Sequence, residues 1–337
     1  MLPPQLENTA TARTALAPAK TKRRFGWANW VIGVQGPLFG LVLLCIIFSC
    51  TTNVFLSVRN ALNILDQVTV LGILAIGMTA VIVIGGIDLS VGSVLALAMM
   101  IMGWLRDTWN VPIPIGIAIA LLAATGCGLA NGLLVTRAKL PAFIATLTMM
   151  SVGRGLANIV TDGRQVVGFP DWFTALASVR NFGFLSVTVG LFIALVIVSW
   201  IFLNYHAIGR SLYAIGGGAE VARLAGIHVQ QLTLWVYALA GLLSGVAGIA
   251  MASRLDSSEP SAGLGYELDT IAAVVIGGAS LSGGVGGIAG TVVGVLIIGV
   301  LHNGLNLSGV SPFVQQVIIG VVIALAVTFD TLRRKEN

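Results

Sequence analysis

The chain has 337 residues, of which 57% are hydrophobic and only 9% are charged, and its net charge is +5 at pH 7. A soluble domain carries about 25% charged residues, so this composition excludes a water-soluble globular protein. The uncharged runs 36–58 and 111–136 are longer than the roughly 20 residues that a helix needs to cross a bilayer, and the short alternating segments of a membrane β-barrel do not occur.

The chain begins with a leader, residues 1–28, that is rich in Ala, Thr, Pro and basic side chains and is expected to be disordered in the cytoplasm. Its basic cluster, Lys20–Arg24, lies just ahead of the first apolar segment and is expected to fix the membrane topology rather than to bind nucleic acid. Transmembrane segments are predicted near residues 32–51, 64–84, 90–105, 112–135, 142–160, 184–203, 232–252, 267–281, 287–305 and 313–331.

We therefore predict an all-α, polytopic membrane protein, a bundle of about ten transmembrane helices. Its membrane domain would occupy residues 29–332, including an inner loop at 204–231, and a cytoplasmic tail would follow at 333–337. The segments 90–105 and 267–281 are short for full crossings, so each is predicted to be a half-helix or re-entrant element.

Ten spans place both chain ends on the same side of the membrane. Basic residues gather in the proposed inner segments, whereas eight acidic residues fall in the proposed outer ones. An excess of Lys and Arg marks cytoplasmic segments, so both termini are predicted to be cytoplasmic.

No pattern typical of an enzyme or a metal site is found. Cys45, Cys50 and Cys127 lie in or beside apolar runs without metal-ligand spacing and are expected to be packing residues. The three histidines lack the i,i+4 pairing of a helical metal site. The sequence has no phosphate-binding GxxxxGK[ST] loop, no HExxH and no GxSxG. We expect no catalytic residue, no metal and no cofactor.

A glycine-rich segment is repeated. Residues 84–92, IGGIDLSVG, return at 276–284 as IGGASLSGG, with six identities in nine positions. Repeated, glycine-interrupted segments in the two halves of a membrane protein indicate a translocation pathway between them, although a chain with 42 glycines can also match by chance. The predicted helix junctions, which would form the gate, are Gly85, Gly86, Asp88, Ser90, Gly277, Gly278 and Ser280.

Asp88 is an isolated carboxylate between two apolar segments. Placed at a helix junction, it can accept backbone N–H bonds at the start of a helix beginning near Leu89, and Ser280 occupies the equivalent place in the repeat. The alternative is that Asp88 lies within the membrane and carries a proton. The junction favours the structural cap.

The inner loop 204–231 contains three glycines, 216–218, that are predicted to break the chain. A short helix is predicted over Glu220–Ala225, with Glu220 near its positive end and Gly226 as its stop. Its apolar side would suit a groove in another protein. An ordinary capped surface turn is the alternative.

Several motifs carry a family resemblance. The segment Glu220-Val221-Ala222-x-x-x-Gly226 is similar to the EAAxxxG motif by which ATP-binding-cassette (ABC) importers contact their ATPase, departing only at Val221. The segments GIDLSVGS at 86–93, FIATL at 143–147, GxGYELDxIAAVV at 263–275 and NGLNL at 303–307 resemble the ribose-type permeases of bacterial ABC sugar importers. The resemblance runs from about residue 60 to the C terminus.

The resemblance implies an inner-membrane permease subunit that imports a monosaccharide, a ribose-like pentose or a hexose. It implies three partners: a separate cytoplasmic ATPase, a periplasmic sugar-binding protein, and a second permease chain, with a homodimer favoured over a heterodimer. The residues expected to contact the ATPase are Glu220, Ala222, Arg223, Leu224 and Gly226.

Polar residues within the spans are candidates for the pathway, because amides and hydroxyls can handle a neutral sugar. They are Asn131, Thr146, Asn158, Asn303, Asn306 and Gln315. Bonding between neighbouring helices is the alternative role. In the acidic outer segments, Asp256, Glu259 and Glu267 are candidates for docking the binding protein, with ordinary solvated charge as the alternative.

Two other classes of transporter stay open from the residues alone. A secondary transporter driven by an ion gradient would use Asp88 as its intramembrane carboxylate. A passive facilitator would need no motor.

Overall fold

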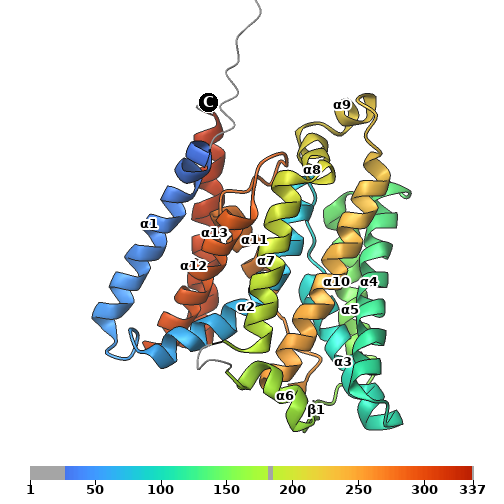
Figure 1. Ribbon diagram of the computed structural model, residues 1–337, viewed down its shortest axis with the longest axis vertical. Helices are drawn as coiled ribbons and strands as arrows, with labels where there is room; N and C mark the ends of the chain where they lie inside the picture. Colours follow the sequence, from blue (N-terminus) through green and yellow to red (C-terminus); the bar gives the residue numbers. More distant parts are fainter. Residues whose placement is uncertain (1–26, 181–184, 336–337) are drawn as a thin grey trace, which may run out of the picture.

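The structure, a computed structural model, describes residues 27–180 and 185–335, so the predicted leader falls outside it except for its last two residues, which begin the first helix. The chain folds into a helical bundle (Figure 1). Its elements are α1 (Trp27–Thr51), α2 (Val58–Val83), α3 (Val91–Trp109), α4 (Ile113–Thr136), α5 (Ala142–Ile159), β1 (Val166–Val167), α6 (Asp171–Ser178), α7 (Val187–Tyr205), α8 (Ala207–Gly217), α9 (Ala219–Leu224), α10 (Val229–Leu255), β2 (Ser257–Ser258), α11 (Tyr266–Ile276), α12 (Ile288–Leu307) and α13 (Pro312–Lys335).

Each predicted span coincides with a helix, which confirms the all-α, polytopic architecture. Within the described residues, seven helices are long and apolar enough to cross a membrane: α2, α3, α4, α5, α7, α10 and α12. The described parts of α1 and α13 add shorter apolar segments, Gly36–Thr51 and Pro312–Val322. The helix α11 has only 11 residues, so the segment predicted at 267–281 is indeed too short for a full crossing.

The prediction that residues 90–105 form only a half-helix is wrong. The helix α3 continues to Trp109 and has 19 residues. Arg106, in the last turns of this helix, contacts the loop that contains β1. It donates to the Val167 carbonyl oxygen at 3.2 Å, and its guanidinium lies 5.4 Å from the Phe169 ring centroid. These contacts allow the helix to extend beyond its apolar stretch.

The core forms around α10, which packs against α2, α3 and α4. Membrane helices gain little from hydrophobic association and rely on close packing of small residues. Glycines supply that closeness between α4 and α10, because a Cβ added at Gly128 or Gly241 would overlap backbone of the opposite helix.

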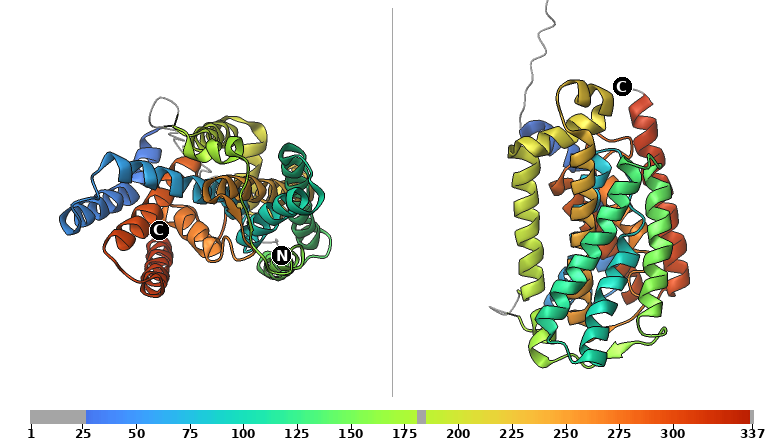
Figure 2. Two further views of the ribbon diagram at one scale, coloured as in Figure 1. Left: turned by 90° about the horizontal axis from the view of Figure 1, so that it is seen from below. Right: turned by 90° about the vertical axis from the view of Figure 1, so that its right-hand side faces the viewer.

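The two ends of the bundle differ in what they carry. The start of α1 and the end of α13 lie at the same end as α8 and α9, at the top of Figure 1, while α6 and β1 lie at the opposite end. The long helices run between these ends, as the side view in Figure 2 shows. An even number of passes is therefore consistent with the fold. Following the topology predicted from the charge distribution, we refer to the α8–α9 end as the inner end and to the other as the outer end.

Four short elements were not predicted. The helix α8 occupies much of the inner loop, and Gly216 and Gly217 are its last residues, so the predicted break is correct only at Gly218. At the outer end, α6 follows the 160–170 loop, and β1 pairs antiparallel with β2, Val166 opposite Ser258.

Candidate functional site

The two repeated glycine segments form the same kind of helix end. Gly85 (φ 82°) and Gly278 (φ 93°) follow α2 and α11 in the left-handed conformation that glycine tolerates best. The N–H of Gly86 then bonds to the Val81 carbonyl oxygen, and the residue after Gly278 makes the equivalent bond, as in a Schellman cap. The sequence repeat aligns Gly278 with Gly86. The left-handed glycine of the first segment, Gly85, therefore stands one residue earlier in the repeat than that of the second segment, Gly278.

The other glycine of each pair is required by close packing. A Cβ added at Gly86 would overlap the Tyr237 hydroxyl of α10. A Cβ at Gly277 would overlap the Gly290 carbonyl group, at the crossing of α11 and α12. The glycines therefore serve both to end a helix and to admit a neighbour.

Asp88 is a buried turn residue rather than the N-cap. Its side chain is 1% exposed, and Oδ1 accepts the backbone N–H of Ser90 at 2.8 Å and the Ser90 hydroxyl at 2.6 Å. The helix begins at Val91, with Ser90 as N-cap, so the start expected near Leu89 is two residues too early, whereas the expected backbone N–H bond to the Asp88 carboxylate is present. The reason is that residues 89–90 form a turn that brings the Ser90 N–H beneath the carboxylate. Ser280 makes the same turn, because its hydroxyl accepts the N–H of Ser282 at 3.2 Å.

Two of the polar residues predicted for the pathway hold this segment in place. Asn131 of α4 donates to the Ser90 hydroxyl at 2.9 Å, and Thr146 of α5 donates to the Ile87 carbonyl oxygen at 3.1 Å. Asn131 and Thr146 are both fully buried. They are brought together with Asp88 and Ser90 in one polar cluster inside the bundle.

The helix α8 rests on both glycine segments. The Gly284 N–H bonds to the Val83 carbonyl oxygen at 2.9 Å, and a Cβ at Gly216 would overlap both of these groups. The Tyr213 hydroxyl donates to the Gly286 carbonyl oxygen at 2.9 Å. The end of α2, the 277–287 segment and α8 thus meet through backbone, with no side chain between them at Gly216. We call this contact the glycine junction.

The short helix α9 presents bare apolar side chains at the inner end. Val221 and Leu224 are 72% and 75% exposed, while Ala222 is buried. Glu220 and Arg223 form an exposed ion pair at 2.5 Å, and this partner lowers the pKa of the Glu220 carboxyl. The left-handed Gly226 (φ 83°) ends the element, as predicted.

The remaining amides of the predicted pathway lie in three separate places. Asn303 and Asn60 are buried and exchange two amide hydrogen bonds of 2.9 Å, which join α12 to α2. Asn306 is exposed, and its Oδ1 accepts from Gln315 at 2.8 Å. Asn158 is apart from both, exposed on α5.

The exposed side of α5 carries polar residues among exposed apolar ones such as Val152 and Ile159. Thr148, Ser151, Gly155 and Asn158 are all exposed, and their spacing places them on one helix face. Within the described bundle this face has no protein neighbour, although polar groups at membrane depth normally face protein or a water-filled cavity.

The three predicted docking acids differ in availability. Asp256 is exposed, but its Oδ1 accepts the backbone N–H of Phe169 at 2.8 Å and so fixes the loop beside β1. Glu267 is partly buried and accepts the Gly265 N–H at 3.2 Å at the start of α11. Glu259 is partly buried and makes no side-chain hydrogen bond within the described residues.

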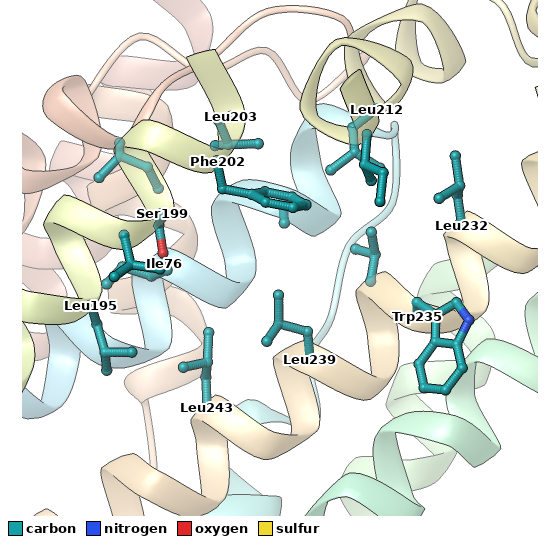
Figure 3. A pocket seen from close by; sticks show the side chains of 15 residues that line it. Ile76, Leu195, Ser199, Phe202, Leu203, Leu212, Leu232, Trp235, Leu239 and Leu243 are labelled. Carbon is teal, nitrogen blue, oxygen red and sulfur yellow. The ribbon is translucent and has the colours of Figure 1, made fainter. Parts of the chain in front are cut away.

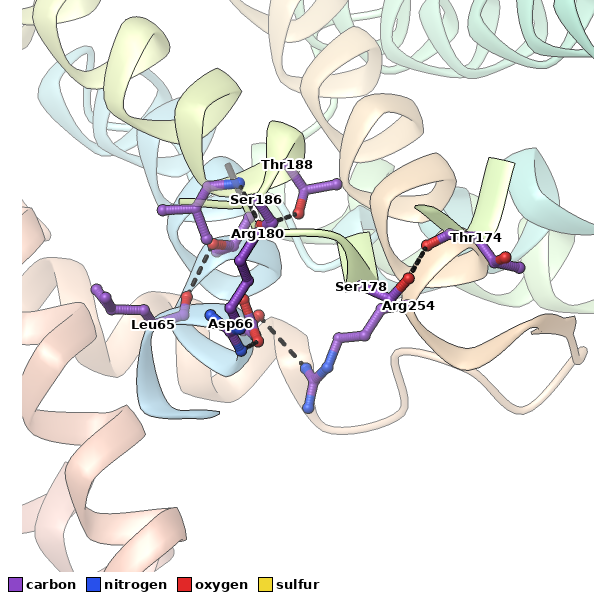
Figure 4. Close-up of polar contacts among 10 residues, drawn as sticks. Leu65, Asp66, Thr174, Ser178, Arg180, Ser186, Thr188 and Arg254 are labelled. Carbon is purple, nitrogen blue, oxygen red and sulfur yellow. Dashed lines mark hydrogen bonds and ion pairs between the residues drawn. The ribbon is translucent and has the colours of Figure 1, made fainter. Parts of the chain in front are cut away.

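At the outer end, a group of charged residues links α2 to the connection between α6 and α7 and to the end of α10. Asp66 forms an ion pair with Arg180 at 2.6 Å, and Arg254 approaches the Asp66 carbonyl oxygen (Figure 4). These contacts tie the first part of α2 to segments that are more than a hundred residues away in sequence.

A cavity of about 420 Å³ lies between α7 and α10 and is almost wholly apolar (Figure 3). Leu195, Phe202, Leu239 and Leu243 point into it, and Ser199 is its one hydroxyl. Because a sugar needs hydrogen-bonding partners, this cavity is unsuited to it.

A smaller cavity at the outer end is polar, and most of its residues were not predicted. It is lined by Gln67, Leu71, Arg254, Tyr266, Asp269, Gly299, His302 and Asn306. The sequence held one signal for it: His302 and Asn306 are four apart on a helix and so share a face. Among the residues that the structure describes, no group of three or more His, Cys, Asp or Glu could hold a metal ion.

Comparisons with known proteins agree with one another. A family model described as branched-chain amino acid transport system / permease component matches residues 60–327. The ribose import permease protein of Bacillus subtilis (strain 168) is 44% identical over 305 residues, covering 88% of this chain and 92% of that protein. That of Escherichia coli (strain K12) is 41% identical over 316 residues, covering 93% and 98%. The L-arabinose ABC transporter permease protein of Azospirillum brasilense is 36% identical over 323 residues, covering 96% and 94%. No solved structure gives a significant match.

Proposed function

The chain belongs to the family of permease components of transport systems, and from that premise we propose that it is the membrane-spanning subunit of an ABC importer for a monosaccharide. The observation that carries this proposal is the 41–44% identity to ribose import permeases over nearly the whole chain. A ribose-like pentose is the favoured cargo, because the L-arabinose permease is also similar. The proposed location is the bacterial inner membrane, with both termini in the cytoplasm.

At the inner end, α9 is the proposed docking element for a cytoplasmic ATPase. Exposed Val221 and Leu224 supply an apolar surface that a partner's groove can cover, and the Glu220–Arg223 pair supplies its polar rim. Closure of the ATPase on ATP would move α9 and α8, and the glycine junction would pass that movement to both glycine segments. This links nucleotide state to the conformation of the pore.

The polar face of α5 supports a homodimer whose translocation route runs between the two copies. Thr148, Ser151, Gly155 and Asn158 offer hydroxyls, an amide and a gap, which suit a neutral, hydroxyl-rich molecule. Of the predicted pathway residues, we assign the exposed Asn158 and Asn306 to the route, and the buried Gln315, which donates to Asn306 Oδ1 and to the Val310 carbonyl oxygen, to positioning Asn306. We assign Asn131, Thr146 and Asn303 to packing, because their hydrogen bonds join buried segments.

At the outer end, Glu259 is the sharpest probe of docking by a periplasmic binding protein. Reversal of its charge, Glu259→Lys, is expected to lower the stimulation of ATP hydrolysis by the binding protein about 3- to 10-fold, because charges at a rim act mainly on the association rate. The effect should shrink as salt is raised. Asp256→Lys is the poorer probe, since it also removes the bond to Phe169. Unchanged stimulation of Glu259→Lys at low salt would remove Glu259 from the interface.

The experiment that tests the function is uptake into proteoliposomes that contain the permease, its cognate ATPase and its binding protein. Uptake of D-ribose should require ATP and both partners and should survive dissipation of the proton gradient. Uptake that persists without ATP but collapses with the proton gradient would instead establish an ion-coupled transporter, and uptake that needs neither would establish a facilitator.

Variants of Asp88 test whether the chain is an ABC importer or an ion-coupled transporter. Asp88→Asn keeps an oxygen acceptor for both Ser90 donors, so folding and uptake are expected to stay within about twofold of wild type. Asp88→Ala leaves these buried donors without a partner and is expected to cost about 1–3 kcal/mol of stability. Thermal unfolding in detergent and uptake in proteoliposomes measure the two effects. An Asp88→Asn permease that folds normally but does not transport would favour the proton carrier.

A further inference from the structure

The polar cavity at the outer end is built from four helices. Gln67 comes from α2, Arg254 from the last turn of α10, Tyr266 and Asp269 from the first turn of α11, and His302 from α12. Its volume of about 220 Å³ is below the roughly 300–1,000 Å³ typical of sites for drug-sized ligands. The cavity is therefore suited to a small molecule.

The cavity contains one carboxylate, Asp269, which is mostly buried and makes a side-chain hydrogen bond through only one of its two oxygens. Asp269 is 8% exposed, and its Oδ2 lies 3.0 Å from Nε2 of His302. Within the described residues, Oδ1 makes no hydrogen bond. Oδ1 is not fully enclosed, and Asp269 lines the cavity, so Oδ1 is a carboxylate acceptor open to a ligand there.

The other polar groups complement this acceptor. The Arg254 guanidinium is exposed at the cavity and makes only a long bond, 3.4 Å, to the Asp66 carbonyl oxygen. Asn306 has its Oδ1 engaged by Gln315, which leaves its NH₂ group as a donor. The Gln67 amide can donate and accept, and the Tyr266 ring adds an apolar surface with a polar tip.

The mixture of groups selects the class of ligand. An anion such as a phosphate would meet the Asp269 carboxylate, and a cation would meet the Arg254 guanidinium. A branched-chain amino acid would need an apolar pocket for its side chain, and Leu71, Gly299 and the Tyr266 ring supply the apolar surface of this lining without enclosing such a pocket among the polar groups. A neutral molecule with several adjacent hydroxyls can donate to Asp269 and accept from the arginine and the amides.

We propose that this cavity is an outer binding site for a neutral sugar, formed around Asp269, His302 and Asn306. The proposal rests on the proposed function, and it adds the point at which the sugar released by the binding protein first contacts the permease. His302 is a positioning residue here, because its contact with Oδ2 leaves Oδ1 free to face the ligand.

The first test measures occupancy directly. Gln67→Cys, at the cavity lining but outside the three central residues, is placed in a permease whose native Cys45, Cys50 and Cys127 are replaced by Ala, assembled with the ATPase and binding protein in proteoliposomes. The rate of labelling by a membrane-impermeant maleimide is expected to fall at least about 5-fold with saturating D-ribose and to be unaffected by L-leucine. Protection by L-leucine alone, or by neither compound, would overturn the site. This arm requires no transport, so it is independent of whether ATP drives uptake.

The second test separates sugar binding in the cavity from ATP hydrolysis by the partner ATPase. Asp269→Asn is expected to lower D-ribose uptake at least about 10-fold, since it removes a charge-assisted acceptor, while ATP hydrolysis stimulated by the binding protein persists. The matched control is Asp107→Asn, an exposed carboxylate at the same end that lies outside the cavity, which should transport normally. Should Asp269→Asn fold poorly, His302→Gln replaces it, with an expected rise in the concentration of loaded binding protein that gives half-maximal uptake. Uptake within about twofold of wild type would contradict the site, whereas a wild-type complex without ATP-dependent uptake would contradict the proposed function instead.

Discussion

A permease carrying Val221→Asp together with Leu224→Asp is expected to lose its ATPase partner and, with it, ATP-driven uptake. The two side chains are 72% and 75% exposed on a six-residue helix at the inner end. The few residues that anchor the centre of an interface contribute at least about 2 kcal/mol each, and with Val221 and Leu224 as those anchors, two buried charges should weaken docking by about 1,000-fold or more. Co-purification of the ATPase with the tagged permease, and uptake in proteoliposomes, measure the loss.

The control for this pair is Leu56→Asp. Leu56 is 77% exposed in the connection between α1 and α2, at the outer end, so it tests the effect of adding charge to an exposed apolar position. This variant should retain the ATPase. Retention of the ATPase by the Val221 and Leu224 variant would mean that the partner docks elsewhere on the inner end.

The second large effect is expected at the glycine junction. Gly216→Ala places a methyl group against the Val83 carbonyl oxygen and the Gly284 N–H, which are bonded to each other. Backbone on both sides cannot yield as a flexible side chain would, so α8 must move away from the two glycine segments. Overpacking of this kind costs about 1–3 kcal/mol or more. Uptake is expected to fall at least about 10-fold.

Gly217→Ala is a matched control in the same helix. Its Cβ would meet no atom within 4 Å, and alanine has a helix propensity better than that of glycine by about 1 kcal/mol. Binding of the ATPase should be retained by both variants, because α9 is untouched. Normal uptake by Gly216→Ala at normal protein levels would show that the junction does not transmit motion.

The helices could be predicted from sequence because apolar length determines them. Every predicted span meets a helix, and the short helix α9 begins and ends within a residue of its predicted bounds, since Gly226 stops it. The helix α8 was missed because its glycines look like a chain break. In the structure Gly216 is required by the neighbouring backbone rather than by a turn, whereas Gly217 has no close neighbour.

The polar cavity could not be read from the sequence in the same way. Gln67, Arg254, Asp269 and His302 lie on four helices, and their convergence depends on how those helices pack. Asn303 and Asn306 show the same limit: they are three residues apart, yet one bonds Asn60 in the interior and the other lines the cavity. Spacing along one helix places residues on a face but does not say what that face meets.

The buried segment around Asp88 also constrains how the protein can be made. Ser90 and Ile87 are bonded by Asn131 and Thr146, which follow them by 41 and 59 residues. At a synthesis rate of about 5–20 residues per second, the second partner emerges from the ribosome about 3–12 s after the segment that it bonds. During that interval the polar turn must stay in water or within the insertion machinery, because lipid offers its backbone no hydrogen bonds. The segment between α2 and α3 can therefore settle only after α4 and α5 have entered the bilayer, which makes the first five helices one unit of assembly.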